Sequence, residues 1–129
     1  MSTIFDVAAA AMQARPEDYR RPSRTIEEFS TALNDHWNTR LRGGESDISI
    51  PALGLTGEAG EVVEFFKKHI RDGASIARNE ALALEFGDVL HYWCRLVYLA
   101  GYTPAEIMEL NERKLAARRL AKLSSGRAA

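Results

Sequence analysis

Residues 55–68 read LTGEAGEVVEFFKK, and residues 82–95 read LALEFGDVLHYWCR, so the two segments align without a gap. In both segments, two carboxylates enclose a glycine and are followed by a valine, an aromatic pair and a basic residue. The apolar residues recur every three or four positions, which is the spacing of a helix face and not of a strand. The sequence therefore predicts two helices with equivalent roles, whose matching acids are Glu58, Glu61, Glu85 and Asp88.

Helix start and stop signals recur along the rest of the chain, whereas no segment shows the alternation of a strand. Capping boxes begin at Thr25 and Thr103, and Pro51 suits the first position of a helix that follows a polar loop over residues 43–49. The sequence predicts an all-α bundle whose four main helices span about residues 26–42, 51–71, 78–100 and 104–123. A short extra helix is predicted over residues 3–14.

Length and composition predict one domain over residues 1–129, with residues 1–25 peripheral and residues 124–129 a frayed tail. The chain has 129 residues, of which 46% are hydrophobic, enough for one core of modest size. Its 17 basic and 18 acidic residues leave a net charge of −1, so we expect neither a nucleic acid polymer nor a membrane as a partner. Cys94, the single cysteine, fits a reducing compartment, and no secretory signal is evident. We therefore expect a cytoplasmic protein.

A helical wheel places an acidic row beside an apolar stripe in each repeated segment. The stripes comprise Leu55, Ala59, Val62, Phe66 and Ile70 in the first segment, and Leu82, Phe86, Val89, Trp93 and Leu96 in the second. If the stripes pack antiparallel, the acidic rows face each other, and their repulsion calls for a bound cation. Carboxylate ligands favour Mg²⁺, Mn²⁺ or Ca²⁺. Gly60 and Gly87 weaken a helix interior, which predicts that the helices approach closely there.

Other interpretations of these residues remain open at this point. Either acidic pair alone is more often a solvated helix face, although two copies in register among apolar residues favour a site. Asp88 and His91 are spaced so that a transition metal could bind, but His91 and His69 are more often structural or solvent-facing. His36, Trp37 and Asn38 could contact a nucleobase or serve in the core and at the surface.

The last predicted helix carries the opposite charge. Asn111, Lys114 and Arg118 are spaced at i, i+3 and i+7, so they share one face that could hold phosphates. Basic residues near a helix C-terminus also stabilise the helix dipole without any ligand. The spacing alone does not separate these two roles.

Three stretches together resemble the MazG-like, all-alpha nucleoside triphosphate pyrophosphohydrolases. They are PALGLTGEAGEVVEFFKKHIRDG, ALEFGDVLHYW and LAGYTPAEIMELNERKLAAR, which contain the E-x-x-E helix and the later E-x-x-D helix typical of that family. The resemblance covers about residues 51–119. It implies that the metal ligands are Glu58, Glu61, Glu85 and Asp88, and that the substrate is held by Asn111, Lys114, Arg118, Tyr92 and Lys68.

The resemblance implies Mg²⁺-dependent hydrolysis of a nucleoside or deoxynucleoside triphosphate to the monophosphate and pyrophosphate, with Mn²⁺ as a substitute metal. Within this set Tyr92 lies near the sugar, and Lys68 or Lys67 supplies a basic group. Glu61 is our choice of general base, because its neighbours take most of the metal coordination. Family members usually form homodimers or homotetramers, so we expect a homo-oligomer.

The chain also departs from the family pattern. Gly57 replaces a glutamate that many members carry, and His91 replaces an aromatic residue. The segment before Pro51 does not align, so base specificity does not transfer.

Two other functions compete with this one. A ferritin-like metal-binding bundle needs Glu-x-x-His on two helices, and this chain offers only Asp88-x-x-His91. A non-catalytic helical interaction protein is the second alternative, and the presence of all four expected ligands argues against it.

Overall fold

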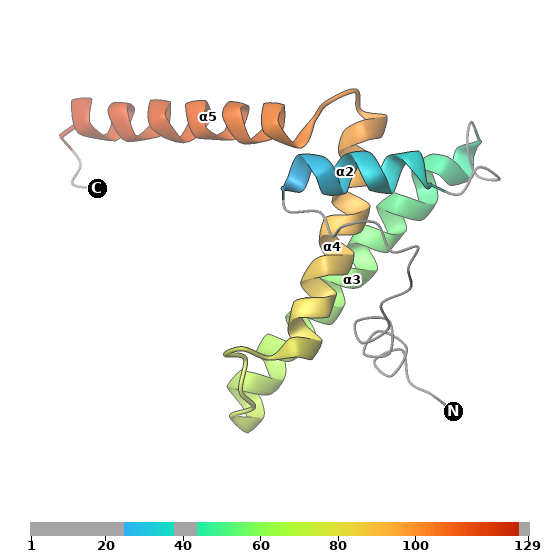
Figure 1. Cartoon of the computed structure of the whole chain (residues 1–129). Coiled ribbons are helices and arrows are strands. Elements are labelled where there is room, and N and C mark those ends of the chain that lie inside the picture. Colours follow the sequence, from blue (N-terminus) through green and yellow to red (C-terminus); the bar gives the residue numbers. More distant parts are fainter. Residues whose placement is uncertain (1–24, 38–43, 127–129) are drawn as a thin grey trace, which may run out of the picture.

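The computed structural model describes residues 25–37 and 44–126, which are helical throughout their regular segments and contain no strand (Figure 1). Four helices follow one another: α2 (Ile26–Asp35), α3 (Glu45–Asp72), α4 (Glu80–Leu99) and α5 (Pro104–Ser124). The all-α prediction with four main helices is confirmed for this part of the chain. The helix predicted over residues 3–14 lies outside the described residues.

Helices α3 and α4 form the main packing unit. They run side by side in opposite directions, and α2 packs against α4 near its C-terminal end (Figure 1). Helix α5 extends away from the other helices (Figure 1). Its start is tied to α2, because the backbone N–H of Ala105 donates to Glu27 Oε1 at 2.5 Å. Within the described residues, no helix is long and apolar enough to cross a membrane.

Helix α2 begins where the sequence predicts but ends earlier. The Thr25 hydroxyl accepts from the backbone N–H of Glu28 at 3.1 Å, which caps the first turn. The helix ends at Asp35 instead of near residue 42, and Trp37, just after the C-cap His36, is buried at 8% exposure. Burial of the apolar indole ring is favourable, and local helix propensity does not predict it.

Helix α3 begins six residues before Pro51, so the predicted loop over residues 43–49 and the predicted start at Pro51 are wrong. Gly44 is the N-cap, and acidic side chains in the first turn complement the helix dipole. The Ser49 hydroxyl also donates to the Glu45 carbonyl at 2.9 Å. Pro51 therefore lies inside the helix, where it cannot donate to the Asp47 carbonyl and its ring crowds that carbonyl, and its side chain is fully buried. The predicted end is confirmed at Gly73, whose φ of 71° is left-handed.

Helices α4 and α5 agree closely with the prediction. Asn79 caps α4 by accepting from the backbone N–H of Leu82 at 3.1 Å. At the start of α5 the predicted capping box is complete, since Thr103 Oγ1 accepts from the Glu106 backbone and Glu106 Oε2 accepts from the Thr103 backbone. Local signals were sufficient here because the caps are made by neighbouring residues.

The core that these helices enclose is small. Among the described residues, the buried hydrophobic side chains are Trp37, Leu82, Cys94 and Val97. Several residues of the predicted apolar stripes are exposed, among them Phe66 at 38%, Phe86 at 50% and Ile70 at 84%. These stripes are therefore only partly covered within one chain, because two paired helices cover only one side of each other.

Candidate metal centre

The repeated segments bring three carboxylates together. Glu58 of α3 and Glu85 and Asp88 of α4 each offer one oxygen, and these oxygens all lie within 4.8 Å of one another. Oxygen ligands about 2.0–2.6 Å from a cation lie no more than about 5 Å apart, so this spacing fits one shared ion. Glu58 and Glu85 are half-buried and Asp88 is exposed. The donor set therefore fits Mg²⁺ or another hard divalent cation.

The cluster makes ionisation of Glu85 unfavourable. Burial is the first cause of its raised pKa, followed by the negative charges of Glu58, Asp88 and Glu61. A hydrogen bond that protonated Glu85 donates to Glu58 acts in the same direction. A bound cation would relieve this repulsion, because it favours the charged forms of all the carboxyls around it.

Glu61 differs from the other three acids of the repeat. It is exposed on α3 and is not part of the group whose oxygens lie within 4.8 Å of one another. Its negative charge nevertheless contributes to the raised pKa of Glu85. The structure thus gathers three of the four predicted ligands and leaves Glu61 at the edge of the cluster.

Among the glycines of α3 and α4, Gly54 is the one that lies against the other helix. A Cβ atom on Gly54 would lie 2.5 Å from Tyr92 Cζ, which is a severe overlap. By contrast, a Cβ on Gly60 or Gly87 would meet no other described atom within 4 Å. The prediction that Gly60 and Gly87 permit close packing within the chain is therefore wrong. A signal was present, since Gly54 lies one helical turn before Glu58.

The rings of Trp37, His91 and Tyr92 form one aromatic cluster. The ring centroids of Trp37 and His91 lie 5.3 Å apart, and Tyr92 contacts His91 edge to face at 5.0 Å. Burial lowers the pKa of His91, against the opposing effect of the Asp88 and Glu58 charges. Trp37 is buried in this aromatic cluster, and His91 is not one of the three clustered ligands.

The other histidine and asparagine candidates lie elsewhere. His36 is exposed at the end of α2, with Nδ1 2.8 Å from the Ala32 carbonyl oxygen. His69 is also exposed, with Nδ1 2.7 Å from the Ala74 carbonyl oxygen, which suits a structural role at the end of α3. Asn38 lies outside the described residues.

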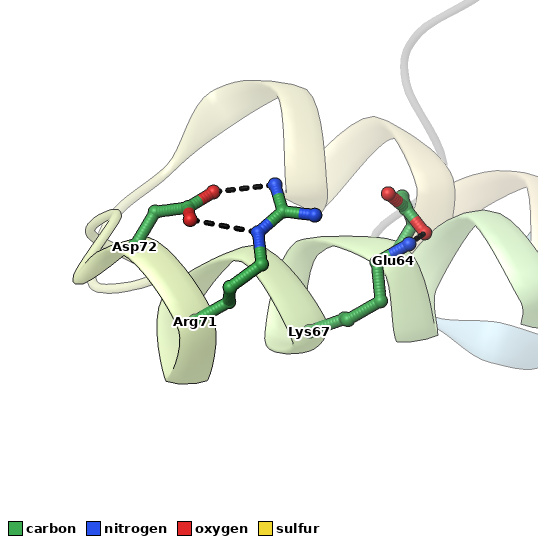
Figure 2. A network of polar contacts seen from close by, with 4 residues as sticks. All are labelled: Glu64, Lys67, Arg71 and Asp72. Atoms are coloured by element: carbon green, nitrogen blue, oxygen red, sulfur yellow. Dashed lines mark hydrogen bonds and ion pairs between the residues drawn. The ribbon is translucent and has the colours of Figure 1, made fainter.

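The two lysines that follow the first acidic motif have different surroundings. Lys67 is ion-paired with Glu64 at 2.6 Å, and this hydrogen bond is the main cause of the lowered pKa of Glu64 (Figure 2). Further along the same helix, Arg71 is paired with Asp72 (Figure 2). Lys68 lies 6.0 Å from the centroid of the Phe65 ring and forms no ion pair among the described residues. Lys68 is therefore the lysine whose charge is open to a phosphate.

The predicted phosphate row is not assembled with the carboxylates in one chain. Asn111, Lys114 and Arg118 are all exposed on α5, the helix that extends away from the α3–α4 pair (Figure 1). A single chain therefore presents an acidic cluster and a basic row on separate elements.

Comparison of the chain with protein-family models, with curated proteins and with solved structures found no match.

Proposed function

We propose that this protein is a Mg²⁺-dependent pyrophosphohydrolase of the MazG-like family, which converts a nucleoside or deoxynucleoside triphosphate to the monophosphate and pyrophosphate. The observation that carries the proposal is the meeting of Glu58, Glu85 and Asp88 within 4.8 Å. These residues come from two segments with the same pattern of acids, glycine, aromatic pair and base. An accidental surface cluster has no reason to repeat that pattern.

Each residue near the cluster has a distinct role in this proposal. Glu58, Glu85 and Asp88 hold the ion, and when bound it neutralises phosphate charge and lowers the pKa of a coordinated water. Glu61, exposed beside the cluster, accepts the proton of the attacking water. Lys68, whose ammonium group is outside any ion pair of the described residues, contacts a phosphate.

Tyr92 contacts the sugar in this scheme. Its ring is half-buried and lies over Gly54, so we expect packing against α3 to hold it in place. A rigid side chain next to the metal ligands can orient a substrate without losing conformational freedom on binding.

A homo-oligomer, either dimer or tetramer, completes the proposed site. Asn111, Lys114 and Arg118 are too separated in the fold to serve the carboxylates of their own chain, so a second copy supplies them to the phosphates. Exposed apolar residues on three helices support this association, since soluble monomers rarely expose large apolar patches. They include Ile70 at 84%, Phe86 at 50%, and Leu120 and Leu123 at 67%.

The proposed activity is tested by measuring pyrophosphate release from a panel of common and modified nucleoside triphosphates with Mg²⁺. We expect the wild type to release pyrophosphate from at least one of them, and Glu61→Gln to lose about 100-fold or more of that rate. Glu64→Gln is the matched control, because it makes the same change on the same helix outside the cluster. Full activity of Glu61→Gln, or turnover of no triphosphate, would contradict the proposal, and orthophosphate release would indicate a different phosphohydrolase.

A further inference from the structure

The most buried charge of the described residues lies outside the proposed site. Arg95 is 2% exposed, and its two terminal nitrogens donate to Asp47 Oδ1 at 2.5 Å and to Asn34 Oδ1 at 3.0 Å. Its guanidinium also lies between the rings of Trp37 and Tyr98, at 4.9 and 5.3 Å from their centroids. One side chain of α4 thus contacts both α2 and the first turn of α3.

The partners of Arg95 are themselves held in place. Asp47 is 8% exposed, and Asn34 is 7% exposed. The Asn34 amide donates to the Ser30 carbonyl at 2.8 Å, which fixes the orientation of the oxygen that Arg95 uses. The planar guanidinium donates in fixed directions, so with two fixed acceptors Arg95 tolerates little displacement relative to α2 and α3.

This ion pair lies at one end of a seam that leads to the carboxylates. Along α3 the seam runs from Asp47 through Gly54 to Glu58, and along the antiparallel α4 it runs from Arg95 through Tyr92 to Glu85. The contacts are the ion pair, the fit of the Tyr92 ring over Gly54, and the meeting of the Glu58 and Glu85 carboxylate oxygens within 4.8 Å. All three contacts are made together in only one axial register of the two helices.

Apolar packing alone specifies that register weakly. Hydrophobic burial is not directional, and many apolar residues of α3 and α4 remain partly exposed. A slide of one helical turn moves a residue by about 5.4 Å along the axis, more than the 4.8 Å that encloses the three carboxylate oxygens. It would also separate the buried Arg95 from Asp47, and breaking a buried ion pair is strongly unfavourable.

We propose that the Arg95–Asp47 pair, together with Asn34, fixes the axial register of α3 against α4, and that Arg95 is thereby a positioning residue for the carboxylate site. The register itself is independent of the enzymatic activity, and only its effect on metal and substrate rests on the proposed function. Setting register is the best-attested role of buried ionic groups in helix pairs.

The test replaces the pair by apolar residues, Asp47→Leu with Arg95→Met, in the full chain. Such a replacement removes the specificity of the pair without leaving a buried charge unpaired. Spin labels on Thr56→Cys and Ala83→Cys, both at exposed positions of α3 and α4, report the register in a Cys94→Ala background. Labelled chains are diluted into unlabelled protein so that only distances within one chain are read.

We expect a single narrow distance in the wild type and a broadened or shifted distribution in the apolar double variant at unchanged helix content. We also expect its Mn²⁺ affinity, read by electron paramagnetic resonance, to fall about 10- to 100-fold, as for other residues that orient metal ligands. Removal of the exposed Arg113–Glu109 pair by Arg113→Gln with Glu109→Gln is the control, and it should change neither readout.

A wild-type distance distribution together with wild-type Mn²⁺ affinity in the double variant would overturn the proposal. If that variant does not fold, Arg95→Lys decides, because lysine keeps the charge but cannot hold both acceptors in a fork. It should broaden the distances, and an unchanged narrow distance there also overturns the register role. If the wild type binds no Mn²⁺ and turns over no triphosphate, the proposed function fails, while the distances still decide the register.

Discussion

Single residues decide how the carboxylate cluster responds to protons. Burial, and then the charges of Glu58, Asp88 and Glu61, raise the pKa of Glu85 above its ordinary value of 4.5. Between the ordinary and the raised pKa, the folded chain binds more protons at this site than the unfolded chain does. The free energy of unfolding of the metal-free protein therefore falls as the pH rises through this window.

Glu85→Gln removes this unfavourable charge, so in the presence of a chelator the variant should melt at a higher temperature than the wild type at neutral pH. The difference should shrink as the pH falls below the ordinary pKa of 4.5, because the carboxyl becomes protonated in both states there. Thermal unfolding across this pH range measures it. Glu64→Gln, which loses only an exposed ion pair, should give no such gain. A lower melting temperature for metal-free Glu85→Gln at neutral pH would contradict the repulsion described above.

At the scale of elements, the contact between α3 and α4 depends on one glycine. Gly54→Ala would place a Cβ 2.5 Å from the Tyr92 ring, and we expect it to lower the free energy of unfolding by about 1–3 kcal/mol. Gly60→Ala has open space around it among the described residues, so its helix propensity should raise stability by up to about 1 kcal/mol. Urea denaturation measures the free energy of unfolding of both variants. Equal effects of the two alanine substitutions would contradict the close contact at Gly54.

The helix boundaries show how much of the fold could be predicted from the sequence. The start of α5 was predictable because Thr103 and Glu106 make the cap with each other, within one turn. The early start of α3 and the early end of α2 were not, because they depend on distant contacts. Asp47 lies in the first turn of α3, where it accepts a hydrogen bond from Arg95. Trp37 follows α2 and packs beside the same arginine. Neither contact is visible in local propensities.

The candidate site was likewise only partly predictable from the sequence. The register of the repeat selected Glu58, Glu85 and Asp88, whose oxygens the structure brings within 4.8 Å, since helical periodicity places matching positions on matching faces. It could not show that Glu61 lies at the edge of the group, because this depends on the crossing of the two helices. The importance of Gly54 was missed for the same reason: a glycine matters only when another element packs against it.

At the scale of the whole molecule, the separation of α5 from the carboxylates gives the proposed oligomer a direct test. Glu85→Gln chains and Lys114→Ala chains are each expected to be inactive. If one chain supplies the carboxylates and another supplies Lys114, a mixed dimer contains one site with both defects and one with none. Purified mixed dimers should then recover up to about half of the wild-type turnover.

Recovery is measured on mixed oligomers purified through two different affinity tags. A mixture of Glu85→Gln chains with Glu58→Gln chains is the control, since both defects lie in the same carboxylate group and every site retains one of them. Failure of the first mixture to exceed this control would show that the basic row and the carboxylates are not shared between copies.

The central claim is that two segments with the same sequence pattern form one cation site, and Mn²⁺ titration followed by electron paramagnetic resonance tests it most directly. We predict saturable binding by the wild type that weakens about 10-fold or more in Glu58→Gln and in Asp88→Asn, which change one ligand from each helix. Glu64→Gln should bind as the wild type does. The absence of saturable binding by the wild type, or equal affinity in all four proteins, would contradict the account.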